Sequence, residues 1–515
     1  MMVSFLCVSS VRSSTDQTFF FIIRHFLPSV NRCNDTHLPP ADIFFRRNLD
    51  KAPRMHYNEE NNCTPKECIT VTYQETLSWL HSMPRTHSAP TLERVRALLS
   101  MVGDPHKALS GRFLHVTGTN GKGSACAFLS SALRAQGYRV GRFISPFIME
   151  FRERIEIDGV QISEDEVIAI GAELMSVVNR YTSETGQTPL EFELVTVMGF
   201  LYFARQGCDF VVLEVGIGGR YDPTNVVTPL LSVIMRVDYD HTELLGDTLA
   251  AIAQQKAGII KPGAPCVLYG DNAPEVYDVI RRRCDETGSA LVVPDAGAIA
   301  VGEVRPGALP FSYRGLNCCL RLSGMYQVRN AVTAIEALRL LPSCGYAMDD
   351  DAIVRGLAAA AFPARFEVLS RTPPIILDGA HNRSGMDALA ENVDVYYPGA
   401  PLFCLCGMLR DKQPEEALAP MLRPETVRFC ACITPPTPRA MPAETLCGIF
   451  SSHGIGAAAY PSVAAALEAL CDLRRTLYPD DAEDTAPILC FGSLYAAGDI
   501  RRACGLESET EHADV

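Results

Sequence analysis

The chain has 515 residues and a formal net charge of −14, with 47% hydrophobic and 21% charged residues. This length predicts two domains plus extensions rather than a single core. The acidic balance disfavours a general nucleic-acid-binding protein, because neutralising phosphates needs a basic surface, and no apolar run approaches the roughly 20 residues of a membrane helix. Nineteen scattered cysteines without zinc-ligand spacing indicate free thiols in a reducing compartment, and disulfides are the alternative that a chain of this length does not need.

The first 70 residues differ in composition from the rest of the chain. They are rich in serine, aromatic and arginine residues, and we interpret 1–70 as a poorly ordered extension and 506–515 as a tail. The arginines are typical of a targeting segment, whereas Asp16, Asp35 and Asp42 are not, and a misassigned start codon is an equal alternative. We expect a cytoplasmic protein, and the extension leaves a mitochondrion or another organelle open.

From Val71 onward the apolar spacing becomes regular. It predicts helices at 73–81 and 92–102, a buried strand at 113–116 and a helix that ends near Gly137. Further buried strands are predicted in two sets, first at 210–215, 231–237, 265–269 and 290–293, and then at 375–377, 402–406, 427–431 and 488–491.

This alternation of strands and helices predicts an α/β protein with two domains. We predict that residues 71–362 form a P-loop-type, mostly parallel sheet domain and that residues 363–505 form a smaller, Rossmann-like α/β domain. The boundary falls near 361–365. Ligands of such sheets bind beyond the carboxyl ends of the strands, so the loops after the strands are the candidate site.

A nucleotide phosphate loop is indicated between the first strand and the next helix, where 115–124 reads His-Val-Thr-Gly-Thr-Asn-Gly-Lys-Gly-Ser. Glycines let backbone N–H groups approach phosphate oxygens, and Lys122 can reach the terminal phosphates. The spacing differs from the common P-loop, since two residues separate Gly118 from Gly121 and Gly123 follows the lysine. A tight turn with a solvated lysine is the alternative.

Two later loops also place polar residues at strand ends. Glu214 begins a glycine-rich turn, where a carboxylate suits Mg²⁺ near phosphates, and a helix-capping acid is the alternative. His241 follows the strand at 231–237 beside acidic residues, which is a weak signal by itself. Lys256 lies on an otherwise uncharged helical segment.

Six motifs follow one another in order: Gly118-Thr-Asn-Gly-Lys-Gly-Ser124, Ser145-Pro-Phe147, Glu214-Val-Gly-Ile-Gly-Gly-Arg220, Asp240-His241, Lys256-Ala-Gly-Ile259 and Asp378-Gly-Ala-His-Asn382. From about residue 71 to 502 the chain resembles the folylpolyglutamate synthase/dihydrofolate synthase family of the Mur ligase superfamily. The resemblance implies a ligase that uses ATP to add L-glutamate to tetrahydrofolate, or to dihydropteroate, through an acyl phosphate. It implies a monomer whose partners are these small molecules, without nucleic acid or membrane.

The resemblance also implies roles for individual residues. The ATP loop is formed by Gly118, Thr119, Asn120, Gly121, Lys122, Gly123 and Ser124, and the nucleotide is also contacted by Asn330, Arg365 and Asp378. Two Mg²⁺ ions are arranged by Ser145, Glu214, His241 and Lys256. In well-described members of this family the lysine at the position of Lys256 is N6-carboxylated, and an unmodified lysine that meets a phosphate or acid is the alternative. The catalytic residues are Lys122, His241, Lys256, Asp378 and His381, although a plain turn is the alternative at 378–381.

The departures from the family pattern concern details. Tyr326 stands where many members have histidine, and Gln255 stands where many have glutamate. The segment 145–154 resembles the bacterial-type branch, which mildly favours two activities and leaves one activity open. Two other functions stay open: a Mur-type ligase that joins an amino acid to a nucleotide-linked peptidoglycan precursor, which Gly123 disfavours, and a non-catalytic nucleotide-binding relative.

Overall fold

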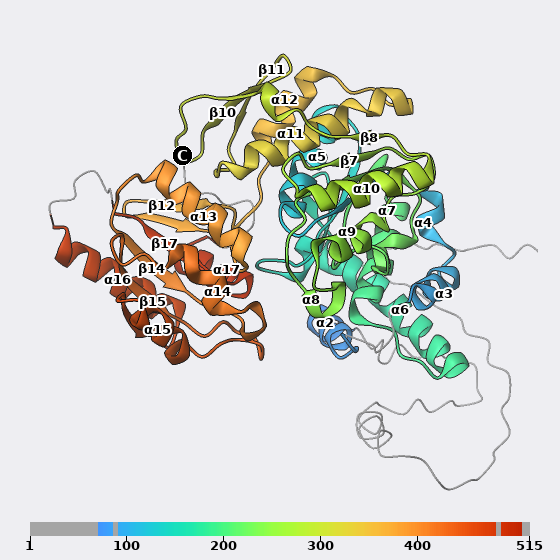
Figure 1. The fold of residues 1–515 in the computed structure, drawn as a ribbon. Coiled ribbons are helices and arrows are strands. Elements are labelled where there is room, and N and C mark those ends of the chain that lie inside the picture. The colour runs from blue at the N-terminus through green and yellow to red at the C-terminus, as the bar shows by residue number, and fades with distance from the viewer. Residues whose placement is uncertain (1–70, 86–90, 480–485, 507–515) are drawn as a thin grey trace, which may run out of the picture. The chain divides into compact units, whose positions relative to one another are not determined.

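The structure, a computed structural model, describes residues 71–85, 91–479 and 486–506. The predicted extension at 1–70 and the tail, except Leu506, lie outside the described residues. The described residues belong to one compact unit (Figure 1). Among them, no helix has the length and apolar character that crossing a membrane requires.

The first half of the described chain is built on an eight-stranded sheet in the order β4-β3-β2-β5-β1-β6-β7-β8. In this order the six strands β2, β5, β1, β6, β7 and β8 pair in parallel. At one edge, β3 pairs antiparallel with β2, and β4 pairs antiparallel with β3. Their bounds are β1 (Phe113–Thr117), β2 (Val140–Phe143), β3 (Ile155–Ile157), β4 (Val160–Gln161), β5 (Phe210–Glu214), β6 (Pro229–Ile234), β7 (Cys266–Leu268) and β8 (Leu291–Val292).

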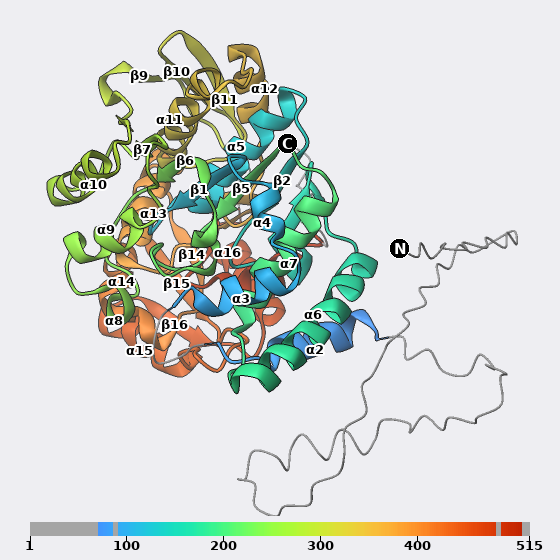
Figure 2. The same ribbon diagram turned by 90° about the vertical axis from the view of Figure 1, so that its right-hand side faces the viewer.

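Helices cover both faces of this sheet (Figures 1 and 2). Alternate residues of β1 separate the faces: Leu114 and Val116 join one buried apolar cluster, and Phe113 joins another. The first cluster includes residues of α5 (Lys122–Ala135), α11 (Tyr326–Arg339) and α12 (Asp350–Ala359). The second includes residues of α2 (Tyr73–His81), α3 (Glu93–Met101), α6 (Glu164–Thr185) and α7 (Glu191–Arg205), and the short α4 (Pro105–Ala108) packs on α7.

A third apolar cluster joins β7 to two helices that follow the central strands. They are α9 (Leu249–Ala257) and α10 (Pro274–Thr287), and the one-turn helix α8 (Thr242–Leu245) precedes them. A small antiparallel sheet in the order β11-β10-β9 lies between α10 and α11 in the sequence. Its strands are β9 (Ile299–Val301), β10 (Leu309–Tyr313) and β11 (Leu316–Leu320).

The second half of the chain forms a six-stranded sheet in the order β12-β13-β17-β14-β15-β16, parallel except for β12. Its strands are β12 (Glu367–Arg371), β13 (Pro374–Leu377), β14 (Leu402–Cys406), β15 (Val427–Cys432), β16 (Gly456–Ala459) and β17 (Ile488–Phe491). One apolar cluster includes α13 (Arg383–Tyr396), α14 (Pro414–Leu418) and α15 (Ala443–Ser452). A separate cluster includes α16 (Val463–Leu477) and α17 (Leu494–Ala503).

The predicted α/β class, with a mostly parallel first sheet and a parallel second sheet, is confirmed. The strand predicted at 231–237 is too long, because β6 ends at Ile234 where its neighbour β1 ends at Thr117. Val237 is buried in the core although it lies outside the strand, so an apolar residue at this position does not indicate a longer strand. The parallel strands β2 and β16, the antiparallel edge strands and the small antiparallel sheet were not predicted. The boundary near 361–365 stays a prediction, and it lies between α12 and β12.

Candidate active site

The predicted phosphate loop lies between the carboxyl end of β1 and the first residue of α5, Lys122. Its glycines are required by close approaches: a Cβ at Gly118 would lie 2.7 Å from Met235 Cβ, and one at Gly121, where φ is +86°, would lie 2.7 Å from Asn330 Oδ1. The Lys122 ammonium donates to the carbonyls of Gly118 and Thr119, at 3.1 and 3.2 Å. The lysine therefore lies over the loop, at the start of a helix whose dipole favours anions.

Helix α11 packs against this loop and brings Asn330 beside it. Gln327 Nε2 donates to Ser124 Oγ at 3.2 Å, and Asn330 Nδ2 donates to Gln327 Oε1 at 3.1 Å. These three polar side chains are buried. The hydrogen bonds hold the predicted nucleotide contact Asn330 next to Gly121, more than 200 residues away in sequence.

The neighbouring strands β2 and β5 bring Ser145 and Glu214 together. The Ser145 N–H donates to Glu214 Oε2 at 3.3 Å, and the glutamate is 4% exposed. Burial raises the pKa of Glu214, and the nearby Lys122 ammonium and the Ser145 N–H oppose that rise. A buried carboxylate at this position is suited to a cation, which would offset its desolvation.

The glycine-rich turn after Glu214 is fixed by Asp222, which the sequence reasoning did not assign. Its buried carboxylate accepts the N–H groups of Ile217 and Thr224 at 3.0 Å each, and Thr117 Oγ1 donates to Gly218 O at 2.6 Å. Asp222 follows the motif by two residues, so its position in a turn was the available signal. The glycine-rich turn is therefore held by two side chains, that of Thr117 at the end of β1 and that of Asp222 after the turn.

His241 and Lys256 come from the segment after β6 and from α9. Burial lowers the pKa of His241 to about 4, although Asp240 opposes this, so the imidazole is neutral at neutral pH. Burial, together with Lys122, lowers the pKa of Lys256 well below its ordinary value. Lys256 is 3% exposed, and its amine has no hydrogen bond within the described ranges. Burial thus disfavours the charged forms of both side chains, and the uncharged forms are the ones that bind metals and carbon dioxide.

Asp378 lies at the end of β13 in the second sheet and is held by three donors. It accepts the N–H groups of Phe366 and Ala380, at 2.8 Å each, and the Tyr326 hydroxyl at 3.0 Å. Burial raises the pKa of Asp378, and the nearby Arg365 and these donors oppose the rise. The contact with Tyr326 had no sequence signal beyond the departure from histidine, because the two residues are 52 positions apart.

Polar side chains connect the phosphate loop to the second sheet domain. Asn120 Nδ2 donates to Ser384 Oγ at 2.6 Å, and Asn382 Nδ2 donates to Asp240 Oδ2 at 3.4 Å. Lys412 Nζ donates to Asp240 Oδ1 at 2.6 Å. Lys412 is not among the site residues predicted from the sequence, and its side chain is 8% exposed.

His381 lies beside the same aspartate. Its Nε2 is 4.0 Å from Asp240 Oδ2, and the corresponding distance from His241 Nε2 is 3.9 Å. Burial lowers the pKa of His381 to about 4, so neither histidine forms a true ion pair at neutral pH. Both are neutral imidazoles beside a carboxylate that Lys412 already balances.

The structure thus brings the predicted residues to one region. Lys122 acts electrostatically on Glu214, His241 and Lys256. No group of three or more His, Cys, Asp or Glu with the geometry of a metal site occurs among the described residues. Of the four predicted metal-site residues, two are of these residue types, namely Glu214 and His241. A carboxylated Lys256 would add a second carboxylate to this set.

Comparison with known proteins gives the family. Residues 116–338 match the Mur ligase middle domain, and 364–485 match the Mur ligase, glutamate ligase domain. The chain is 38% identical over 350 residues to a dihydrofolate synthase/folylpolyglutamate synthase of Bacillus subtilis. The aligned region covers 66% of this chain and 81% of the relative. The chain belongs to the folylpolyglutamate synthase/dihydrofolate synthase family.

Solved structures of this family have the same fold. A folylpolyglutamate synthase of Mycobacterium tuberculosis, complexed with ADP and AMPPCP, is 27% identical with a TM-score of 0.76, covering 84% of this chain and 98% of that one. An FPGS–AMPPCP–folate complex is 32% identical with a TM-score of 0.70, covering 84% and 99%. As a member of this family the chain is an ATP-dependent ligase, which decides against the peptidoglycan-ligase and non-catalytic alternatives.

Proposed function

We propose that this enzyme uses ATP to activate the terminal carboxylate of a folate and joins it to the amine of L-glutamate. The observation that supports this most is the set of contacts around the phosphate loop: Lys122 lies over the loop, and Asn120 is hydrogen-bonded to Ser384 of the second sheet domain. Relatives of this fold have been solved with ADP, with AMPPCP and with folate. A nucleotide and a folate are therefore the proposed ligands here.

A carboxylate is a poor acyl donor until one of its oxygens becomes a good leaving group. In the proposed reaction that oxygen attacks the γ-phosphorus of ATP, the bond to ADP breaks, and an acyl phosphate forms. The glutamate amine then attacks the acyl carbon, loses a proton, and phosphate leaves. Lys122 would neutralise charge on the transferred phosphoryl group, and Asn330, Arg365 and Asp378 would hold the nucleotide.

The residues around the loop fit magnesium ions. Glu214 is a buried carboxylate whose hydrogen bond is a single 3.3 Å contact with a backbone N–H, and His241 is a neutral imidazole. With Ser145 and Lys256 they would hold the ions, which would supply charge neutralisation for the phosphates. The family resemblance supplies the roles, and the burial of Glu214 supports them.

Lys256 is proposed to be N6-carboxylated. Lys256 is 3% exposed, and its amine meets no carboxylate within hydrogen-bonding distance in the described part of the chain. The charges of Asp240 and Asp222 therefore only partly offset the cost of burying an unmodified ammonium there. Attack of the amine nitrogen on carbon dioxide forms a C–N bond and releases one proton to water, which leaves a carboxylate. That carboxylate would complement Glu214 and His241.

The lysine of the phosphate loop provides the direct test. Lys122→Ala should lower ATP-dependent glutamate incorporation by about a hundredfold to a thousandfold or more, the range for removing one group that stabilises transition-state charge. Lys107→Ala is the matched control, because Lys107 is 69% exposed on α4 and pairs with Asp104. ADP release and product mass are measured for both. Equal activity of the two variants would refute the assignment of the loop.

Lys256 is tested separately from turnover. Nuclear magnetic resonance with ¹³C-bicarbonate should give a carbamate signal in the wild-type enzyme that is missing in Lys256→Ala. Lys261→Ala, which changes a nearby lysine, should keep the signal. A signal that persists without Lys256 would place the modification elsewhere.

A second activity, the addition of glutamate to dihydropteroate, is favoured by the likeness to the Bacillus subtilis enzyme with both names. ADP release with ATP, Mg²⁺ and glutamate is measured with dihydropteroate, with tetrahydrofolate and with neither. One-glutamate mass increments on both acceptors support two activities, and increments on one acceptor restrict the enzyme to it.

A further inference from the structure

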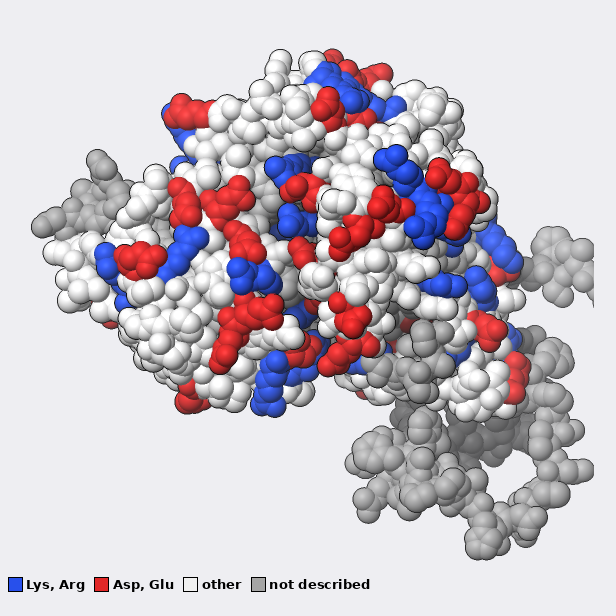
Figure 3. Space-filling view, viewed as in Figure 1, with Lys and Arg blue, Asp and Glu red and all other residues white. Residues whose placement is uncertain are grey.

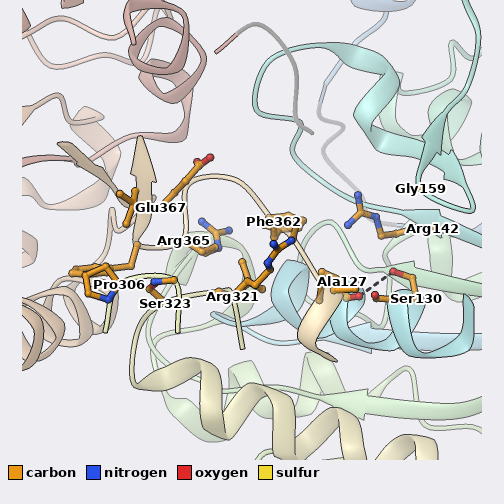
Figure 4. Close-up of a pocket in the computed structure, with 18 of the residues that line it drawn as sticks. Ala127, Ser130, Arg142, Gly159, Pro306, Arg321, Ser323, Phe362, Arg365 and Glu367 are labelled. Atoms are coloured by element: carbon orange, nitrogen blue, oxygen red, sulfur yellow. Dashed lines mark hydrogen bonds between the residues drawn. The ribbon is translucent and has the colours of Figure 1, made fainter. Parts of the chain in front are cut away.

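A cavity of about 540 Å³ lies beside the linker between α12 and β12 (Figure 4). Its walls come from α5, from β2 and β3 with the turn after β3, from the segments before β10 and α11, and from the end of α12 with the linker and β12. Arg365 is the lining residue that it shares with the proposed nucleotide site. The volume is in the range of small-molecule sites.

The walls of this cavity are strongly basic in an acidic chain. Five arginines line it together with two glutamates, Glu156 and Glu367. Each glutamate already has an arginine partner: Glu156 pairs with Arg142 at 2.6 Å, and Glu367 pairs with Arg501. Arg365 lies near the Asp378 carboxylate, so three lining arginines are left without a carboxylate partner in the described part of the chain.

Three of the lining arginines are exposed: Arg134, Arg321 and Arg371. Within the described ranges none of them forms an ion pair or a side-chain hydrogen bond. Arg134 packs over the β3–β4 turn, where a Cβ at Gly159 would collide with its guanidinium. The face of the molecule in Figure 3 mixes acidic and basic side chains.

The cavity does not offer a free aromatic face for a nucleotide base. The Phe362 ring has the Arg142 guanidinium 5.7 Å and the Arg365 guanidinium 5.4 Å from its centroid, and it packs on Gly123. Phe366, the other lining aromatic residue, is 1% exposed. Arginines without a stacking surface favour a ligand that carries several carboxylates along a chain.

We propose that this cavity binds the oligo-γ-glutamyl tail of a folate, away from the reacting carboxylate. The proposal rests on the proposed function, because a ligase that adds glutamate to folates meets such tails as product and as substrate. The three exposed arginines would pair with successive tail carboxylates. The enzyme would then hold long-tailed folates more tightly than folates with one glutamate.

The test uses the variant Arg134→Gln/Arg321→Gln/Arg371→Gln in the full chain. An exposed arginine–carboxylate pair changes affinity by roughly twofold to fivefold, so the three together should weaken binding by about tenfold or more. The control Arg96→Gln/Arg281→Gln/Arg428→Gln removes three exposed arginines that do not line the cavity. The variant Arg134→Lys/Arg321→Lys/Arg371→Lys keeps the positive charge and should restore part of the affinity for the tail.

Free penta-γ-glutamate, inorganic phosphate and ADP are titrated calorimetrically into each protein. We expect penta-γ-glutamate binding that is lost in the glutamine variant and kept in the control, with ADP binding unchanged. The KM for pentaglutamyl tetrahydrofolate should rise in the glutamine variant, and that for the monoglutamate should not. Equal penta-γ-glutamate binding by both variants, or arginine-dependent binding of phosphate alone, would overturn the proposal.

These outcomes are separate from a failure of the proposed function. If the wild-type enzyme adds no glutamate to any folate, the function fails, whether or not the cavity binds the free tail. If it adds glutamate but the tail binds independently of the three arginines, only the cavity proposal fails.

Discussion

The hydroxyl of Tyr326 should set the charge state of Asp378, and Tyr326→Phe tests this. The hydroxyl is one of three donors to the buried Asp378 carboxylate, at 3.0 Å. A hydrogen bond to a charged group is worth about 1.5–3 kcal/mol, and one pKa unit corresponds to about 1.4 kcal/mol. Removing the hydroxyl should therefore raise the pKa of Asp378 by about one to two units.

The sign follows from which form the hydroxyl stabilises. Burial already raises the pKa of Asp378, and the tyrosine opposes that rise by favouring the ionised form. Without it, the ionised carboxylate is lost at a higher pH, so the acid limb of the activity profile should move to higher pH by about one to two units. The loss of folding stability should be largest at neutral pH and should shrink as the pH falls and Asp378 becomes protonated.

Steady-state ADP release across pH and urea unfolding measure the two effects. Tyr313→Phe is the control, because Tyr313 lies in β10 of the small antiparallel sheet and its hydroxyl also meets a buried carboxylate, that of Glu336 in α11, at 2.6 Å. It should lose comparable stability without moving the pH profile or the KM for ATP. If Tyr326→Phe changes stability alone, as the control does, the contact is structural and the reasoning is refuted.

Two further predictions concern the phosphate loop and the strand before it. Gly123→Ala should destabilise the protein by about 1–3 kcal/mol in urea unfolding, because the added Cβ would lie 2.5 Å from the Phe362 ring. Phe362→Leu should relieve part of this loss. If the two substitutions change the free energy of unfolding additively in the double variant, the contact is contradicted. His115 is fully buried, and burial lowers its pKa to about 3, below the unfolded value near 6.5, so stability should be lost as the pH falls below about 6.5. Between pH 7 and 5 the wild type should lose about 2 kcal/mol more than His115→Gln, and equal losses would refute the titration.

The sequence by itself determined the helices and most of the parallel strands that flank the site loops, together with the local chemistry of those loops. The helix at 73–81 and the strands at 402–406 and 488–491 were predicted with the bounds that the structure has. Apolar spacing is a local property, and so is the order of glycines, lysine and hydroxyl around Lys122. Buried residues alternate with more exposed ones along β10 and β11, and Arg314-Gly315 lies between the two strands. This pattern is typical of a β-hairpin, although the hairpin is not among the elements predicted above.

Only the tertiary structure decided which loops meet. Asn120 and Ser384 are 264 positions apart, and Tyr326 and Asp378 belong to different sheet domains. Such contacts depend on how two sheets pack around a linker, and no local pattern of residues encodes that packing. The arginine-lined cavity has the same origin, because Arg134, Arg321 and Arg371 come from three separate segments that only the fold brings to one wall.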